Sequence, residues 1–508
     1  MDFSSSSMKE WYKRDRVSIF RRHKSIRVSA FFVVFAVIFS MTAGCTVSSD
    51  TPFPKVTQPA PEDSSIVTPA GSDPSASVSE STAGSVLLKV AAPISNDTAQ
   101  YLARLYTLKE SGEWNVQQSG STVSLDVLDA TIPSFSVEIL QTPSTGATED
   151  TILQWKDSGF VPDIICTDAL SKLMENGDIL PLSDYAASNS LYLPTSVYTP
   201  MLDTCSIDDL LYGIPYSASA QILYVNMNVL EASGVDSVPF NLDLDTLTSI
   251  SEAVRVTSTE ETPLEEQKFA FYKASDLLSF LPSSFSNKTG WLMFNGKSFN
   301  FSAGSFKDTV TFLRSYVAAG YSVESLTPED QALAFSSLDP RLSNRVAFWS
   351  GSTSEVSLWS ENQAYTLSIA RIPAENAETD SRLALTVYPL CISSETESPQ
   401  LACDFASFIA LDEDAVLLSA RLENREGLLP VVSSSAVWNA ICLQQTFGEE
   451  LLLLKDKVPE AYFNPVTNHG SEYLLARQIL NQYSTPLMDS KIDLQTLIVS
   501  LSNTRLDA

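Results

Sequence analysis

The sequence predicts an α/β protein with a parallel sheet. Apolar, strand-like runs lie at residues 85–92, 135–140 and 161–166. Helix-like runs alternate with them at residues 99–108 and 151–158. Such alternation is typical of βαβ units, whose parallel strands place ligands beyond their carboxyl ends. The 508 residues also exceed what one hydrophobic core usually serves, so two or three domains are expected.

Residues 212–234 predict a segment that passes between packed bodies. Gly213 weakens a strand interior and Pro215 cannot donate a ladder hydrogen bond, so residues 212–216 favour an edge or crossing strand. Residues 221–225 are apolar and predict a second, separate strand. Asn228 is expected to cap the short helix that follows.

The N-terminus predicts a targeting segment. Eight basic residues precede an apolar run at residues 30–41 and the sequence Thr-Ala-Gly-Cys at 42–45. This order is typical of a signal peptide over residues 1–44, whereas a transmembrane anchor needs about 20 apolar residues. The last four residues resemble the bacterial lipobox, which implies cleavage before Cys45 and acylation of its thiol. Two or three acyl chains would anchor the protein stably to a membrane.

A disordered tether is expected at residues 45–84. This stretch is rich in Ser, Thr, Pro, Ala and Asp and has few large apolar side chains. Such a composition cannot bury enough surface to offset the entropy of ordering. The tether would let a folded domain reach away from its lipid.

The charge balance disfavours polyanionic partners. The chain carries 32 Lys and Arg against 61 Asp and Glu, a formal net charge of −29 at pH 7. A surface this acidic repels nucleic acid and anionic headgroups.

Cysteine usage favours neither a metal site nor a disulfide framework. No CxxC spacing occurs, and an odd number of cysteines follows Cys45, which allows at most two disulfides. Three of them lie in apolar runs and are expected to be buried small hydrophobes: Cys166, Cys391 and Cys403. No cofactor is expected.

Five segments occur in the order of one family's motifs. They are Val-Pro-Asp-Ile-Ile at 161–165, Gly-Asp-Ile-Leu-Pro-Leu-Ser-Asp-Tyr at 177–185, the crossing segment 212–234, Arg-Val-Ala-Phe-Trp-Ser-Gly at 345–351 and Gly-Leu-Leu-Pro-Val at 427–431. Together they resemble the family 1 extracellular solute-binding proteins, the sugar-type receptors of bacterial ABC importers. The resemblance implies a two-lobed, type II periplasmic-binding-protein-like fold with three hinge crossings, a monomer, and ABC permease subunits as partners.

The resemblance also implies lobe boundaries. Lobe I would comprise residues 85–215 and 384–427, and lobe II residues 216–383 and 428–508. Residues 384–392 would cross back to lobe I. Further helices are expected on lobe II near residues 437–445, 472–483 and 494–501.

Solute capture needs polar side chains at strand ends and aromatic faces that stack on the ligand. Asp168, just past strand 161–166, occupies the family's strand-end position, with a helix N-cap as the alternative role. Tyr216 and Ser217 face the cleft in the family pattern, with a core aromatic as the alternative role of Tyr216. Ser95, in the loop after the first strand, is a further candidate.

One departure concerns the aromatic contact. The family often has Gly-x-Trp shortly after the strand that contains Trp349, and the indole stacks on a sugar. This chain has Gly351, Ser352 and Thr353 there, so Thr353 stands at the Trp position and joins Ser352 as a candidate contact. Trp349 faces either the cleft or the core. Other aromatic candidates are Tyr388, Trp291 and Trp359.

Enzyme motifs are the main rival. Residues 290–298 end in Gly-Lys-Ser, but bulky side chains between the glycines would block a phosphate cradle. His469 is the only histidine after residue 44, and no Gly-x-Ser-x-Gly elbow occurs. A hydrolase that uses two acids stays open as an alternative, as does a surface lipoprotein with a sensory role. The leading hypothesis is a lipid-anchored receptor that delivers a carbohydrate or related small polar solute to an ABC permease.

Overall fold

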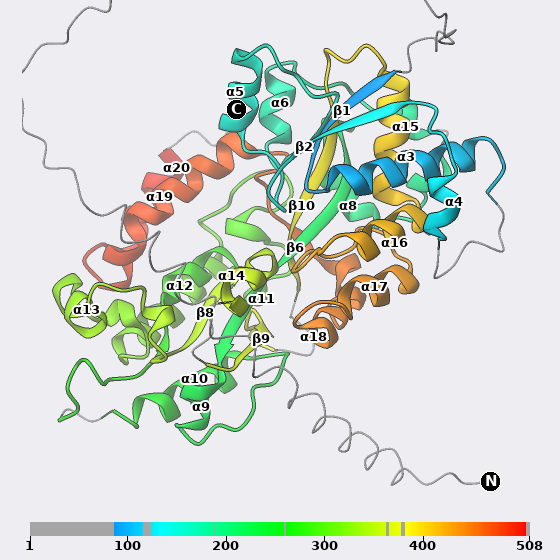
Figure 1. Cartoon of the computed structure of the whole chain (residues 1–508). Coiled ribbons are helices and arrows are strands. Elements are labelled where there is room, and N and C mark those ends of the chain that lie inside the picture. Colours follow the sequence, from blue (N-terminus) through cyan, green and yellow to red (C-terminus); the bar gives the residue numbers. More distant parts are fainter. Residues whose placement is uncertain are drawn as a thin grey trace, which may run out of the picture. The chain divides into compact units, whose positions relative to one another are not determined.

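A nine-stranded mixed sheet forms the framework of the protein. Figure 1 shows the computed structural model, which describes residues 86–114, 123–187, 189–258, 261–361, 365–376 and 382–503. The expected signal peptide and tether lie outside these residues. The strands of the large sheet are β1 (Leu87–Ala92), β2 (Ser136–Gln141), β3 (Ile164–Cys166), β6 (Gly213–Asn226), β7 (Phe269–Phe271), β8 (Val346–Ser352), β9 (Leu367–Arg371), β10 (Ala384–Ile392) and β11 (Tyr462–Phe463).

The strand order is β2-β1-β3-β10-β6-β8-β7, with β11 beside β10 and β9 beside β6. A separate hairpin consists of β4 (Ser206–Ile207) and β5 (Leu210–Leu211). Strand β1 runs parallel to both β2 and β3, as the alternation of strands and helices predicted. Strand β10 runs antiparallel to β3 and β6, and so closes the parallel part of the sheet.

Helices cover both faces of this sheet (Figure 1). The α-helices of the described residues are α3 (Asn96–Glu110), α4 (Leu125–Asp129), α5 (Glu149–Asp157), α6 (Leu170–Glu175), α7 (Ser183–Ala187), α8 (Thr199–Thr204), α9 (Met227–Glu231), α10 (Leu244–Arg255), α11 (Pro282–Phe285), α12 (Gly304–Ala318), α13 (Pro328–Phe335), α14 (Val356–Glu361), α15 (Pro399–Leu411), α16 (Glu413–Leu422), α17 (Ser435–Cys442), α18 (Gly448–Leu452), α19 (Gly470–Met488) and α20 (Leu494–Asn503). None of the helices within the described ranges has both the length and the apolar character that a membrane crossing requires.

Strand β6 is the longest and links the two ends of the sheet. The sequence predicted two strands here, but the structure has one continuous strand of 14 residues. Its first part pairs with β10, and from Gln221 onward it pairs with β8 and β9. The register shifts where Pro215 lies opposite Pro389, so Tyr216 is the extra residue of a β-bulge. Because of the bulge, the strand continues past Pro215 although proline has no backbone N–H to donate to β10.

Two hydrophobic cores lie along this strand. The first contains side chains of β1, β3, α3, α15 and α16. The second contains side chains of α10, α12 and α19. We call the parts of the protein around these cores the first and second lobes.

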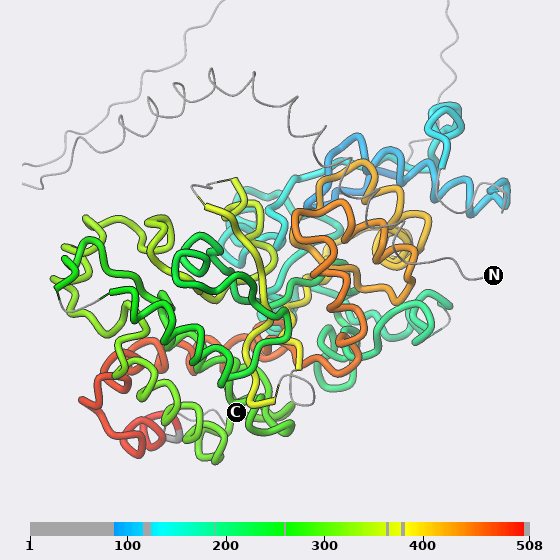
Figure 2. Tube along the Cα trace, turned by 90° about the horizontal axis from the view of Figure 1, so that it is seen from below, coloured from blue at the N-terminus to red at the C-terminus, as the bar shows by residue number. Residues whose placement is uncertain are grey.

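Helix α17 corrects the expected assignment of the segment after residue 428. Residues 437–445 were expected on lobe II, but Val437 and Trp438 lie in the first core. Isolated bridges between Val197 and Val432 and between Ala218 and Leu429 hold the preceding chain on the first lobe. Figures 1 and 2 show α17 beside α16, while the later helix α19 lies with the second lobe.

Smaller expectations are also resolved. Asn226 rather than Asn228 caps α9, because its Oδ1 accepts hydrogen bonds from the backbone N–H of Asn228 at 3.1 Å and of Val229 at 3.4 Å. All five cysteines in the described ranges are free and buried: Cys166, Cys205, Cys391, Cys403 and Cys442. Burial was predicted for Cys166, Cys391 and Cys403.

Candidate functional site

Strands β6 and β10 present a polar face where they cross between the lobes. Their register places Ser217 opposite Tyr388 and Ser219 opposite Thr386. Side chains alternate along a strand, so Gln221 shares the face of Ser217 and Ser219. Ser219 Oγ lies 2.9 Å from the Tyr388 hydroxyl. Polar groups therefore line one side of the crossing from the first lobe to the second.

This polar face leads to a cavity of about 320 Å³ in the second lobe. The cavity lies at the carboxyl ends of the parallel strands β7 and β8. Lys273, Ser275 and Asp276 follow β7, and Ser350 and Gly351 end β8. Carboxyl ends of parallel strands are where open α/β sheets bind ligands. We call this space the strand-end cavity. The rest of its polar lining consists of Gln221, Ser279, Glu355, Asn464, Tyr473, Arg477, Asn481 and Ser484.

A half-buried carboxylate holds the turn after β7. Glu324 accepts hydrogen bonds from the Ser275 backbone N–H, at 2.9 Å, and from the Ser275 hydroxyl. Burial raises the pKa of Glu324 above its usual value. In the same turn, Lys273 pairs with Asp276 at 3.1 Å. Glu324 thus fixes the turn through Ser275, and Lys273 and Asp276 of the same turn border the cavity.

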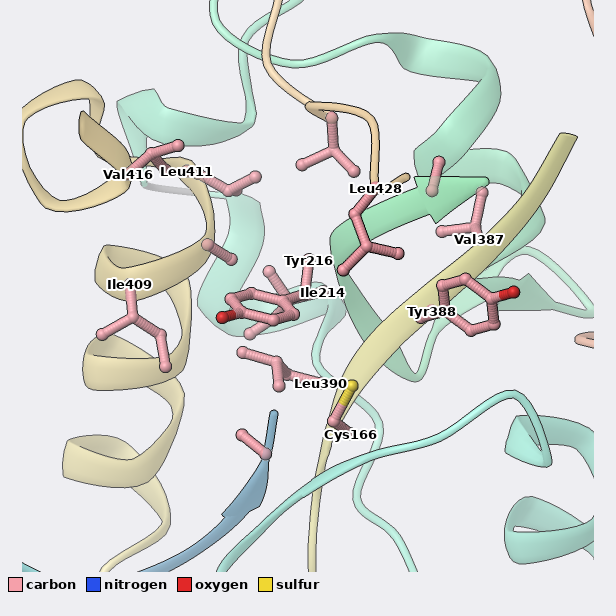
Figure 3. Close-up of a cluster of buried hydrophobic side chains, with 14 of the residues drawn as sticks. Cys166, Ile214, Tyr216, Val387, Tyr388, Leu390, Ile409, Leu411, Val416 and Leu428 are labelled. Atoms are coloured by element: carbon pink, nitrogen blue, oxygen red, sulfur yellow. The ribbon is translucent and has the colours of Figure 1, made fainter. Parts of the chain in front are cut away.

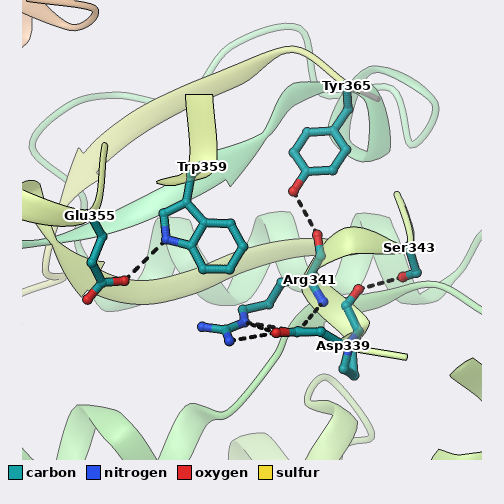
Figure 4. A network of polar contacts seen from close by, with 7 residues as sticks. Asp339, Arg341, Ser343, Glu355, Trp359 and Tyr365 are labelled. Carbon is teal, nitrogen blue, oxygen red and sulfur yellow. Dashed lines mark hydrogen bonds and ion pairs between the residues drawn. The ribbon is translucent and has the colours of Figure 1, made fainter. Parts of the chain in front are cut away.

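The wall after β8 is fixed by a capping box. Ser352 Oγ accepts a hydrogen bond from the Ser354 backbone N–H at 3.2 Å, and Glu355 Oε1 accepts one from the Ser352 N–H at 3.3 Å. The Trp359 indole N–H donates to the other oxygen of Glu355 at 3.2 Å (Figure 4). Glu355 is therefore held from two sides at the cavity wall.

A cation in turn supports Trp359. The Arg341 guanidinium lies 4.5 Å from the Trp359 ring centroid and pairs with Asp339 at 2.6 Å. The Tyr365 hydroxyl donates to the Arg341 carbonyl at 2.7 Å (Figure 4). These contacts make the wall rigid before any ligand arrives.

The lining of the cavity suits a neutral, polar ligand. The cations Lys273 and Arg477 match the carboxylates Asp276 and Glu355. The Trp291 ring packs edge to face on Phe280, with ring centroids 4.9 Å apart, and both rings border the cavity. Aromatic faces with a few placed polar groups are typical of sites for small polar solutes. In the described ranges, no group of three or more His, Cys, Asp or Glu side chains is placed to bind a metal ion.

Asp168 follows β3 in the first lobe and is half-buried. It does not cap α6, whose N-cap is Ala169 without a side-chain hydrogen bond. Burial raises the pKa of Asp168 and also that of the Tyr388 phenol, to which the charge of Asp168 adds a smaller upward contribution. The structure thus brings Asp168 and Tyr388 together at the first-lobe end of the polar face.

Tyr216 and Ser217 point to opposite faces of β6. Tyr216 is buried in the first core, and Figure 3 shows it on the other side of β10 from Tyr388. The bulge and the strand alternation explain this position. Ser217 is buried on the polar face, and its hydroxyl has no hydrogen-bond partner among the described residues.

The remaining predicted contacts have packing or capping roles in this structure. Trp349 is fully buried and stacks on Tyr224 with ring centroids 5.7 Å apart. Thr353, also fully buried, accepts a hydrogen bond from the Ala220 backbone N–H at 3.0 Å. Ser95 caps α3 and donates its hydroxyl to Glu423 at 2.5 Å.

Gly427 lies against the carbonyl of Thr353, with a backbone φ of +76°. A Cβ at this position would clash with that carbonyl. Only glycine combines this close approach with a left-handed backbone. The segment around Gly427 therefore packs tightly against the start of the short 3-10 helix, Thr353–Glu355, that follows β8.

Sequence reasoning missed most of the strand-end cavity. Strand β7 has only three residues and was not predicted, so the polar residues after it had no strand end to mark them. Gln221 was read as part of an apolar strand. The rule that ligands bind at strand ends would have found Lys273 and Asp276 once β7 was known.

Comparisons with known proteins bear on this fold. A family profile described as bacterial extracellular solute-binding protein matches residues 131–439. The ABC substrate-binding protein Lmo0181 from Listeria monocytogenes, solved with cycloalternan, has a TM-score of 0.58 at 12% identity, over 82% of this chain and 97% of that one. A cyclic alpha-maltosyl-1,6-maltose binding protein from Arthrobacter globiformis has a TM-score of 0.58 at 14% identity, over 83% and 98%.

The sugar-binding protein MalE from Xanthomonas citri has a TM-score of 0.56 at 13% identity, over 82% of this chain and 95% of that one. At such identities the likeness shows the fold, which is the periplasmic-binding-protein-like fold that the sequence predicted. No curated protein matches the sequence significantly. The family profile covers more than half of the chain, and the chain therefore belongs to the bacterial extracellular solute-binding protein family.

Proposed function

We propose that this protein captures a neutral saccharide at the strand-end cavity and delivers it to an ABC importer, while a lipid on Cys45 holds it at the outer face of the cell membrane. The observation that carries the proposal is the lining of that cavity. Two cations balance two carboxylates around aromatic rings, and a charged solute would find no net opposite charge there. Hydroxyl-rich neutral solutes match such a surface.

The printed names of similar structures support the class of solute. They include proteins bound to cycloalternan and mannobiose, and a receptor for a cyclic maltosyl maltose. The family consists of solute-binding receptors rather than enzymes, so the hydrolase alternative is excluded. Delivery to a permease is supported by the printed names of two of these similar structures, an ABC substrate-binding protein and an ABC transporter solute-binding protein.

The crossing strands supply a mechanism for capture. The lobes touch where the Ser171 N–H donates to the Thr467 carbonyl at 2.9 Å and the Gly470 N–H donates to the Ser171 hydroxyl at 3.1 Å. Small φ/ψ changes in β6 and β10 would open and close the lobes around these contacts. Closure would bring Asp168 and Tyr388 toward a solute held by Gln221 and Asp276.

A thermal-shift screen of the full chain tests the proposal. The protein is kept in a detergent without sugar headgroups and mixed with maltotriose, cellotriose or mannobiose. A ligand at about 100 times its Kd stabilises the folded state by about 2.7 kcal/mol, which raises Tm measurably. We expect at least one sugar to do so without being consumed, as chromatography of the supernatant would show. Unchanged Tm with every sugar would overturn the choice of saccharide.

A further inference from the structure

A second cavity, of about 550 Å³, lies at the edge of the sheet beside β11. Its walls come from both lobes. Asp203 and Thr204 lie on α8, whose neighbours Met201 and Cys205 are in the first core, whereas Trp291 is in the second core. We call this space the edge cavity. It is larger than the strand-end cavity and shares only Trp291 with it.

Trp291 separates the two cavities. Its indole contacts the Tyr473 hydroxyl, which faces the strand-end cavity. Trp291 also borders the edge cavity, together with the rings of Phe294, Tyr462 and Phe463. The edge cavity therefore has aromatic faces of its own, suited to stacking on a sugar ring.

The rim of the edge cavity is held by backbone hydrogen bonds. The Arg382 guanidinium donates to the carbonyls of Asn287 and Thr289, both at 3.1 Å, and of Glu460 at 3.2 Å. The Gly290 N–H donates to the Phe294 carbonyl at 2.7 Å. These bonds occupy much of the Arg382 guanidinium and fix the loop, so the site is built before a ligand binds.

Apart from Arg382, whose guanidinium is directed at three backbone carbonyls, the charged groups on the rim balance each other. Lys288 and Asp203 carry one opposite charge each, and both are exposed at the rim. Asn468 is half-buried in the wall, and its side-chain amide makes no hydrogen bond with the described residues. A free amide beside aromatic rings offers a donor and an acceptor to sugar hydroxyls.

We propose that the edge cavity is a second saccharide site, which binds a neutral sugar independently of the strand-end cavity. The inference rests on the proposed function only for the class of solute. Because its walls belong to both lobes, a sugar in this cavity would link α8 to the loop that contains Trp291. Occupancy would then favour conformations in which these two segments are close.

A pair of lysines in one loop allows a matched test. Lys288 lines the edge cavity, and Lys297 is exposed nearby without lining it. Since the five described cysteines are buried, Lys288→Cys and Lys297→Cys each add an accessible thiol for an environment-sensitive fluorophore. Cys45 is common to both variants. Each labelled full-length protein is titrated with maltotriose, cellotriose and mannobiose, and Tm is followed in parallel.

We expect a saturable fluorescence change for the label at Lys288→Cys and none at Lys297→Cys. Adding Asn468→Ala should raise the sugar concentration at the midpoint of this fluorescence titration about fivefold, as for the loss of one hydrogen bond. Adding Gln221→Ala should leave that midpoint within about twofold. Circular dichroism would confirm that these variants fold. A Tm rise without any signal at Lys288→Cys would overturn the second site and leave the proposed function standing. A signal that weakens with Gln221→Ala but not with Asn468→Ala would also overturn it, because the label would then report the strand-end cavity.

Discussion

The guanidinium of Arg425 lies 4.5 Å from the ring centroid of Tyr216 and donates a hydrogen bond to the Tyr216 hydroxyl. Both residues are buried, and Tyr216 faces the first core rather than the polar face of β6. The pair ties the first part of β6, close to its start at Gly213, to the segment that precedes Gly427. Tyr216 thus stabilises the crossing strand from its core side and does not face the polar side.

Tyr216→Phe should lower stability without changing solute affinity. The substitution keeps the ring but leaves the buried Arg425 donor without its acceptor, which costs about 1 to 3 kcal/mol. Urea denaturation measures the loss, and calorimetric titration measures the affinity. Tyr316→Phe is the control for removal of a tyrosine hydroxyl in the second core, because Tyr316 lines neither cavity. A Tyr216→Phe protein with wild-type stability and weaker binding would place Tyr216 at the ligand instead.

Asp168→Asn should stabilise the ligand-free protein at neutral pH. Burial raises the pKa of Asp168 in the folded state, so ionisation above its unfolded pKa costs folding free energy as pH rises toward the folded pKa. The amide removes this cost. The gain over wild type should therefore vanish at pH values below the ordinary aspartate pKa.

Unfolding curves at several pH values measure this gain, and Asp157→Asn on the exposed surface is the control. A pH-independent difference would contradict the assignment. If Asp168 also accepts hydrogen bonds from a bound saccharide, Asp168→Asn should bind it more weakly despite the higher stability.

Trp359→Phe tests whether the indole of Trp359 holds Glu355 at the cavity wall. Phenylalanine keeps an aromatic face for Arg341 but cannot donate to Glu355. We expect a loss of about 1 kcal/mol in stability and a few-fold rise in Kd, because Glu355 is then free to leave the cavity wall. The Trp359→Phe, Glu355→Gln double variant should show non-additive losses. Strict additivity in a double-mutant cycle would mean that the two side chains act separately.

Cys45→Ala should abolish lipid attachment. If residues 42–45 are a lipobox, the Cys45 thiol is the acylated group, and alanine has no thiol to be acylated. Growth with a labelled fatty acid should mark the wild-type protein alone. Equal labelling of wild type and variant would refute this reading of residues 42–45.

The fold was largely predictable because its elements carry local signals. The run at 384–392 is mostly apolar and coincides with β10, and helix α19 has the expected position. Strand β6 was divided in two because Pro215 argues locally against a continuous ladder. A bulge opposite Pro389 overrides that argument, and only tertiary pairing creates it.

The site was predictable only where it follows strand ends. Asp168 was predicted from its place after β3 and Tyr388 as one of several aromatic candidates, and both stay predictions as ligand contacts, since neither lines the strand-end cavity. Trp349 shows the limit, since an indole on a strand looks the same whether it faces a cleft or a core. Here Tyr224 and Trp359 enclose it, and neither neighbour is visible from the local sequence.

The most direct test of the polar face and its cavity is a calorimetric titration of matched glutamine variants. Gln221 lines the strand-end cavity, whereas Gln478 is exposed on α19 and lines neither cavity. Both substitutions are made with Asn468→Ala, which weakens the second site, and are titrated with the sugar that gives the largest Tm shift. We predict that Gln221→Ala raises Kd about two- to tenfold through the loss of a hydrogen bond, while Gln478→Ala leaves Kd unchanged. Equal Kd values for the two variants would contradict the placement of the solute at the strand-end cavity.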